Sequence, residues 1–184
     1  MKDLYKIAAA ASKQVYIDNI DTGSVEYKLS FATYQDKPLQ VLSFAGTGKE
    51  LSDWAANFYL LSWKGIKKSS YNAAKKIQKN IFPQLTTSPL LVTGHSLGAA
   101  HAIAYKKLFN ANYCVAFAPA RCLRYWTNRE MENTTLFIDP DDPVSKVGFI
   151  NFGHPVCKVV ESENDHVGIK VSDHYMNNWV EFVG

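Results

Sequence analysis

The sequence predicts an α/β fold, in which helices flank a mostly parallel central sheet. Helical and strand patterns alternate along the chain, and several strand segments are short, apolar runs of the kind found in buried strands. The 184 residues are 47% hydrophobic and 13% aromatic, which is sufficient for one sizeable core. No repeat, low-complexity tract or linker divides them, so we expect a single domain over residues 1–184.

Four helices are predicted from periodicity and composition. Residues 4–15 are rich in alanine, and residues 97–109 place Ala100, Ala104 and Leu108 on one inner face. A basic helix within residues 63–82 ends at Pro83, because proline disrupts a continuing helix. Residues 174–182 are expected to close the chain as a helix.

The strands are predicted from apolar runs bounded by turn residues. Residues 26–34 and 39–44 are expected to be strands joined by a turn around Asp36, Lys37 and Pro38. Residues 90–93 follow Pro89 as a short apolar run, which is typical of a buried strand. Further strands are expected over 113–118, 135–138 and 156–160, the last of them at the outside of the sheet. Strands that alternate with helices favour parallel pairing.

Export signals and membrane spans are not predicted. The longest stretch without a charged residue, 80–105, contains Pro83, Pro89 and two histidines. The apolar run 7–11 is too short for the hydrophobic region of a signal peptide. Cys114, Cys122 and Cys157 form an odd set without paired spacing, which favours a reducing compartment. We therefore expect a cytoplasmic location, or release by a non-classical route.

The positive charge is concentrated in the first half of the chain. The net charge is 20 − 17 = +3, which is too small to favour a nucleic-acid partner. Residues 1–91 carry 12 lysines against 7 acids, a balance of +5. The excess comes mainly from Lys64, Lys67, Lys68, Lys75, Lys76 and Lys79. Two interpretations stay open: the solvated face of an amphipathic helix, which is favoured, or a peripheral contact with anionic lipid headgroups.

The most informative segment is the Gly-x-Ser-x-Gly pattern formed by Gly94, Ser96 and Gly98. It follows an apolar strand and opens a helix of small residues, which is the strand-to-helix context that the pattern needs in order to hold an exposed serine. The turn from strand to helix is tight, so the residues flanking the serine must lack a Cβ. Ser96 is therefore predicted to be a nucleophile held in a strained turn at a helix N-terminus.

A serine nucleophile needs a histidine base, and the base needs an acid that orients it. In folds of this type the order along the chain is serine, acid, histidine. The acids just past a buried strand are Asp139, Asp141 and Asp142, and spacing alone does not choose among them. For the aspartates at 139 and 141, the favoured interpretation is that they form a turn and have no catalytic role. The histidines that follow are His154, His166 and His174. The earlier His95 and His101 are interpreted as packing or solvated residues.

An anionic intermediate also needs backbone donors. The N–H of Leu97, the residue after the nucleophile, is the first expected donor. The second should come from a loop that follows an earlier strand, where Gly46 and Gly48 flank Thr47. We predict the Thr47 N–H as the second donor.

These residues resemble the class 3 (fungal-type) lipase family of the α/β-hydrolase fold. The resemblance covers nearly the whole chain and is carried by an alanine-rich first helix over 8–16, the strand end 44–47, the pair Asp53 and Trp54, the segment 63–66, the elbow 94–99 and the segment 117–121. The resemblance selects Asp142 as the acid and His174 as the base, and it places the oxyanion donor at Thr47. Two departures, Ala45 for arginine and Ser145 for proline, put the substrate in question rather than the chemistry.

The resemblance implies ester hydrolysis through an acyl-enzyme intermediate, with no metal or organic cofactor. The expected substrates are carboxylic esters of lipids or small acyl esters. A phospholipase or acyltransferase acting on membrane lipids, and a non-catalytic binding module, are the alternatives. Residues 51–61 contain apolar positions near helical spacing and could form a short lid, but a buried strand over 58–61 is favoured. The chain is short for this family, which favours a minimal lid and a compact lipase-like esterase.

Overall fold

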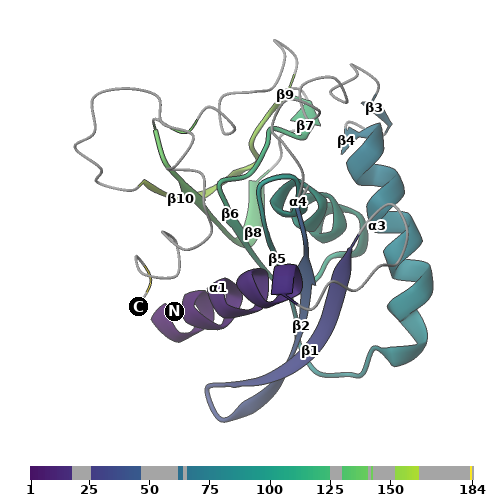
Figure 1. Cartoon of the computed structure of the whole chain (residues 1–184), viewed down its shortest axis with the longest axis vertical. Coiled ribbons are helices and arrows are strands. Elements are labelled where there is room, and N and C mark those ends of the chain that lie inside the picture. The colour runs from purple at the N-terminus through teal and green to yellow at the C-terminus, as the bar shows by residue number, and fades with distance from the viewer. Residues whose placement is uncertain are drawn as a thin grey trace.

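A six-stranded sheet forms the centre of the molecule (Figure 1). The computed structural model describes residues 1–17, 26–46, 62–63, 66–124, 130–140, 142, 152–161 and 183. The strands of this sheet, in spatial order, are β1 (Tyr27–Tyr34), β2 (Lys37–Phe44), β5 (Leu90–His95), β6 (Tyr113–Phe117), β8 (Glu130–Ile138) and β10 (Val156–Glu161). β1 and β2 are antiparallel, and every other pair is parallel. The predicted mostly parallel sheet is confirmed, with β10 at its edge as expected.

The register brings the carboxyl ends of the central strands to one edge of the sheet. His95 of β5 pairs with Phe117 of β6, and Phe117 pairs with Phe137 of β8. Phe44, the last residue of β2, pairs with Gly94. Because these strands run in the same direction, the residues that follow them gather at the same edge, where ligands bind in open parallel sheets.

Helices cover both faces of the sheet, and each face has its own apolar cluster (Figure 1). The helix α1 (Lys2–Ile17) lies on one face, and α3 (Lys68–Ile81) and α4 (Leu97–Phe109) lie on the other. The α1 side buries Leu4, Ala8 and Phe137, whereas the α4 side buries Ile77, Ile103 and Leu136. The cores on the two faces fix the strands between them and so hold the carboxyl edge in place.

The helix α4 is buried on more sides than its predicted inner face requires. Its boundaries match the predicted 97–109, and Ala100 and Ala104 are buried as expected. Leu108 is only partly buried, however, while residues 98–106 are all buried. α3 packs beside α4 on the same face of the sheet. A helix enclosed in this way is apolar on more than one side. The predicted inner face of α4, which took every fourth residue, therefore covered only part of its buried surface.

The turn between β1 and β2 differs from the prediction. Gln35 and Asp36 form it, with φ angles of 51° and 60°. Lys37 pairs with Tyr34, and Pro38 is already part of the strand. A two-residue turn with two positive φ angles matches the twist of an antiparallel hairpin, which the expected turn around residues 36–38 does not. Proline is tolerated at this point because β2 pairs with β5 only from Gln40 onward.

A second, smaller sheet was not expected from the sequence. It contains β3 (Ser62–Trp63), β4 (Ile66–Lys67), β7 (Leu123–Arg124) and β9 (Phe152–Gly153). Outside this sheet, a 3-10 turn, η1 (Phe82–Gln84), follows α3. Strands of two residues are too short to leave a periodic pattern. In addition, β8 begins five residues before the predicted strand 135–138.

Some expectations concern residues that the structure does not describe. The predicted helix 174–182 and the choice between a lid and a strand over 51–61 fall there. Within the described part of the chain, no helix is long and apolar enough to cross a membrane. The three cysteines are free thiols, and Cys114 and Cys122 are buried.

Candidate functional site

Ser96 occupies the turn between the end of β5 and the start of α4. Its backbone angles, φ 59° and ψ −123°, lie outside the regions that residues with a Cβ normally occupy. Such a conformation costs on the order of 1–3 kcal/mol and persists only where the surrounding structure imposes it. The predicted strained turn is therefore present, with the serine at the N-terminus of a 13-residue helix.

The two glycines that flank Ser96 are required by close backbone contacts. A Cβ on Gly94 would lie 2.5 Å from the carbonyl carbon of Gly98. A Cβ on Gly98 would lie 2.2 Å from the carbonyl oxygen of Phe44 and 2.7 Å from the carbonyl carbon of Ala45. These atoms belong to the backbone and cannot move aside as a flexible side chain can. Glycine is therefore needed at both positions, because the first turn of α4 packs directly on the end of β2.

Hydrogen bonds from neighbouring strands hold the serine turn in place. The Ser96 N–H donates to the Phe117 carbonyl at the end of β6, at 3.0 Å. The Ser96 carbonyl accepts from the N–H groups of Ala100 at 3.3 Å and Ala120 at 3.4 Å. The Ala118 N–H in turn donates to Phe137 of β8 at 2.8 Å. The turn is thus tied to β6 and, through Ala118, to β8, which offsets the cost of its backbone angles.

The strand that delivers Ser96 is anchored on the opposite face by α1. Thr93 of β5 is fully buried, and its Oγ1 donates to the Val115 carbonyl at 2.7 Å. Ser12 Oγ of α1 lies 2.9 Å from the same Thr93 oxygen. Because these buried polar groups satisfy one another, β5 is fixed to β6 and to α1 just before the turn.

The candidate acids stand at the same edge of the sheet as Ser96. β8 ends at Ile138, and Asp142 follows in a turn in which its N–H donates to the Asp139 carbonyl at 3.1 Å. Asp142 is completely buried. Asp139 begins the turn, as the turn interpretation expects, but it is also buried, with 1% of its surface exposed, which that interpretation does not explain. Asp141 lies outside the described residues.

Two of the predicted catalytic residues lie outside the described part of the chain. These are Thr47 and His174, and His166 is also outside it. Leu97 is described and is the first residue of α4. The chain just before Thr47 is described as well, since Ala45 is buried and its N–H donates to the Glu26 carbonyl at 3.0 Å. The triad and the oxyanion donors therefore stay predictions, of which Ser96, Leu97 and Asp142 have known positions.

The histidines interpreted as packing residues are buried. His95 is 6% exposed and His101 is 5% exposed. The Nδ1 atom of His101 lies 3.1 Å from the hydroxyl of Ser70, which links α4 to the first turn of α3. Burial, with the nearby Lys67 ammonium as a smaller cause, lowers the pKa of His101 to about 4, so the ring is neutral at pH 7. The sequence does not reveal this pair, because it does not show that α3 and α4 lie side by side.

The lysine cluster of the sequence divides into two environments. Lys67 lies in β4 rather than on a helix and is only 4% exposed, so it is not part of a solvated face. Burial lowers the pKa of Lys67 from 10.5 to about 8. Lys68, Lys75 and Lys79 of α3 are exposed, as is Lys76. Lys64 lies outside the described residues.

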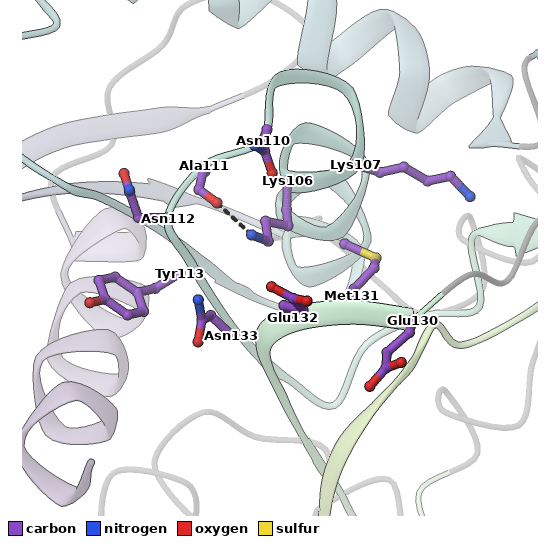
Figure 2. A pocket seen from close by; sticks show the side chains of 10 residues that line it. All are labelled: Lys106, Lys107, Asn110, Ala111, Asn112, Tyr113, Glu130, Met131, Glu132 and Asn133. Atoms are coloured by element: carbon purple, nitrogen blue, oxygen red, sulfur yellow. Dashed lines mark hydrogen bonds between the residues drawn. The ribbon is translucent and has the colours of Figure 1, made fainter.

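A polar pocket of about 600 Å³ lies at the other end of the sheet (Figure 2). Its walls come from the last turn of α4, the start of β6 and the first residues of β8, including Glu130 and Glu132. The Lys106 ammonium points to the Ala111 carbonyl and donates to it at 2.6 Å, which ties the end of α4 to the entry of β6 (Figure 2). Because β5 and β6 run in parallel from this end towards Ser96, the pocket is separate from the serine turn.

Several solved structures share the fold of this chain. Similar solved structures are a lipase and propeptide complex of Rhizomucor miehei (TM-score 0.56, 16% identity, 82% of this chain and 64% of that chain) and a mono- and diacylglycerol lipase of Aspergillus oryzae (TM-score 0.61, 20% identity, 94% and 82%). A lipase of Yarrowia lipolytica is also similar (TM-score 0.56, 14% identity, 92% and 81%). The chain thus spans less than two thirds of the Rhizomucor structure. A search of curated proteins finds no match.

The family comparison covers the region from β2 to β9. The model of the family described as lipase (class 3) matches residues 41–152, more than half of the chain. This region contains the serine turn, the flanking glycines and both described aspartates of the carboxyl edge. The central sheet, its strand directions and the strand-to-helix turn agree with the α/β-hydrolase fold that the solved lipases share. The chain therefore belongs to the class 3 lipase family.

Proposed function

We propose that this protein is a serine hydrolase that cleaves carboxylic esters of lipids, or small acyl esters, through an acyl-enzyme intermediate. The observation that carries the proposal is the backbone of Ser96, held at φ 59° by a turn that permits only glycine two residues before it and two residues after it. A fold keeps a strained serine of this kind at a helix N-terminus where its hydroxyl does chemistry. The proposal extends family membership to an activity of this chain.

In the proposed mechanism Ser96 attacks the ester carbonyl while His174 accepts its proton. Asp142 orients the imidazole and stabilises the imidazolium that forms. The burial of Asp142 at the edge where Ser96 stands supports this role, because a carboxylate shielded from water interacts more strongly with a neighbouring imidazolium. The imidazolium then protonates the leaving alcohol, and water repeats the sequence to release the acid and free Ser96.

The proposed oxyanion donors are the N–H groups of Leu97 and Thr47. The Leu97 N–H stands at the first position of α4, where backbone donors have no partner within the helix. Support for Thr47 comes from the close approach of Gly98 to Phe44 and Ala45, because it places the chain two residues before Thr47 against the start of α4. Two N–H groups near the serine would stabilise the negative charge of the tetrahedral intermediate.

Labelling with a fluorophosphonate probe tests the proposal directly. The probe phosphonylates an activated serine, so the wild-type protein should react and Ser96→Ala should not. A natively folded wild-type protein that stays unlabelled would contradict the enzymatic function and favour a non-catalytic binding module. His174→Ala should abolish labelling as well, whereas His166→Ala should leave it intact. If these two variants behaved in the opposite way, His166 would be the base.

The substrate class is tested by a series of esters that extends from short to long acyl chains and includes a phospholipid. A compact esterase should prefer dispersed short-chain esters. Higher activity on the phospholipid would instead favour the phospholipase or acyltransferase alternative. The ratio of transferred acyl group to free acid at a low concentration of added alcohol distinguishes these two, since a phospholipase should release mainly the free acid and an acyltransferase should favour transfer over hydrolysis.

A further inference from the structure

The outer face of α3 carries a row of exposed side chains in register. Lys68, Lys75 and Lys79 are exposed, and Phe82, directly after the helix, is 67% exposed. The Phe82 N–H donates to the Gln78 carbonyl, and its φ of −48° and ψ of −42° continue the helical path. Positions 68, 75 and 82 are therefore each seven residues apart on one helical path. At about 100° per residue the four side chains fall within roughly 60° of one another.

This row, which we call the α3 outer face, lies opposite the side that α3 buries. The buried side consists of Ser70, Ala73, Ala74, Ile77 and Ile81. Those residues pack against α4 and the sheet, so the α3 outer face is directed away from the core (Figure 1). The polypeptide thus presents three ammonium groups and one aromatic ring to the surroundings along a helix of 14 residues.

Helix stability accounts for only part of this row. α3 contains no acidic residue, and Lys68 stands in the first turn, where the helix dipole disfavours a positive charge. Lys75 and Lys79 are four residues apart, a spacing at which like charges repel. Within the described part of the chain, none of the three lysines makes an ion pair. Lys79 stands in the last turn, where the dipole favours a positive charge, but Lys68 and the close approach of Lys75 to Lys79 are unfavourable for the helix. The row is therefore better explained by something that binds to it.

We propose that the α3 outer face docks on an anionic lipid surface. The three lysines would lie at the level of the headgroups, and the Phe82 ring would enter the boundary with the acyl chains. Binding of a surface helix to a membrane strengthens with its electrostatic attraction to anionic lipids and with the apolar area that it buries, and this row offers both. Charge complementarity identifies the occupant as anionic, and the exposed ring identifies it as a lipid rather than a soluble polyanion. The inference rests on the proposed function: docking on a lipid surface would bring an ester hydrolase to its substrate.

The chain supplies a matched control on the opposite face of the sheet. α1 also carries three exposed lysines, Lys2, Lys6 and Lys13, together with Asp3 in its first turn. Replacing all three lysines of either helix by glutamine changes the net charge by the same amount. A difference between the two triple variants therefore reports on location and not on total charge.

The experiment is co-sedimentation of the full chain with phosphatidylcholine vesicles, with and without phosphatidylserine, in a Ser96→Ala background so that no lipid is hydrolysed. The triple variant of Lys68, Lys75 and Lys79 should bind the anionic vesicles roughly 100-fold more weakly, about 5-fold per lysine. The triple variant of α1 should stay within about 3-fold of the parent, because attraction to the surface decays within a Debye length. Equal losses in the two variants would overturn the proposal, and so would an absence of binding by the parent protein.

Phe82 separates membrane docking from general attraction to polyanions. Phe82→Ser should weaken vesicle binding on the order of 10-fold, and Phe82→Leu should restore most of it. Unchanged binding by Phe82→Ser, together with equally tight binding to heparin, would overturn lipid docking in favour of a polyanion surface. Hydrolysis of a water-soluble short-chain ester by the lysine variant, measured with Ser96 intact, should equal that of the wild type. The docking and the proposed function therefore fail in distinguishable ways.

Discussion

Replacing Ser96 by glycine or by alanine measures the strain stored at the proposed nucleophile. Both variants lack the hydroxyl, but only alanine keeps a Cβ at φ 59° and ψ −123°. Relief of this conformation should contribute about 1–3 kcal/mol. Against it stands the larger freedom of glycine in the unfolded chain, about 0.4–1 kcal/mol. We therefore expect the free energy of unfolding of Ser96→Gly to exceed that of Ser96→Ala by about 1 kcal/mol.

Urea denaturation of the two variants gives this difference, and thermal melting should show it as a gap of about 2–4 °C in Tm for a chain of this size. Lys6 provides the control, because it is exposed in the ordinary helical conformation of α1. There Lys6→Gly should be less stable than Lys6→Ala by about 1 kcal/mol, the opposite sign. If Ser96→Gly were also the less stable of its pair, the serine turn would be unstrained and the reasoning would be refuted.

Three further predictions test other parts of the structure. Gly98→Ala should lower the free energy of unfolding, measured in urea, by about 3 kcal/mol or more, because its Cβ would lie 2.2 Å from the Phe44 carbonyl oxygen. A loss below about 1 kcal/mol would mean that the end of β2 shifts to make room for the Cβ. Asp142→Asn should lower kcat on a short-chain ester about 10⁴-fold with little change in Tm, and Asp139→Asn about tenfold or less; the reverse order would make Asp139 the acid. His101 has a pKa of about 4 in the folded chain and about 6.5 when unfolded, so only the unfolded state takes up its proton between these values. Stability should therefore fall by up to about 3 kcal/mol as the pH drops from 6.5 to 4, and His101→Gln should lack this component; an equal acid sensitivity of that variant would contradict the burial of a neutral ring.

The strand-to-helix turn could be predicted because its determinants are local. Two glycines at fixed distances from Ser96, an apolar run before them and alanines after them are all visible in the sequence. Steric exclusion of a Cβ acts over neighbouring residues, so the pattern and the geometry coincide. The boundaries of α4 followed from the same local signals, and the parallel direction of the central strands followed from the alternation of strands with helices.

The environments of the buried polar residues could not be predicted in this way. Lys67 belongs to a lysine-rich segment, and only the pairing of β4 with β7 takes it out of water. His101 meets Ser70 because α3 and α4 pack side by side, a contact between residues 31 apart in the sequence. The turn of the first hairpin also shifted, since the twist of the paired strands selects a two-residue turn over the turn suggested by Pro38.

The sequence by itself determined the fold class, the position of the serine turn and the family resemblance, because short-range sterics and hydrophobic patterning act between neighbouring residues. The tertiary structure decided which charged residues are exposed and which are buried, because burial depends on which helices and strands pack against each residue. It separated Lys67 from Lys68, one residue apart, by placing the first between strands and the second on the α3 outer face. It also brought Asp142 to the edge where Ser96 stands, since parallel strands end together only once they are paired.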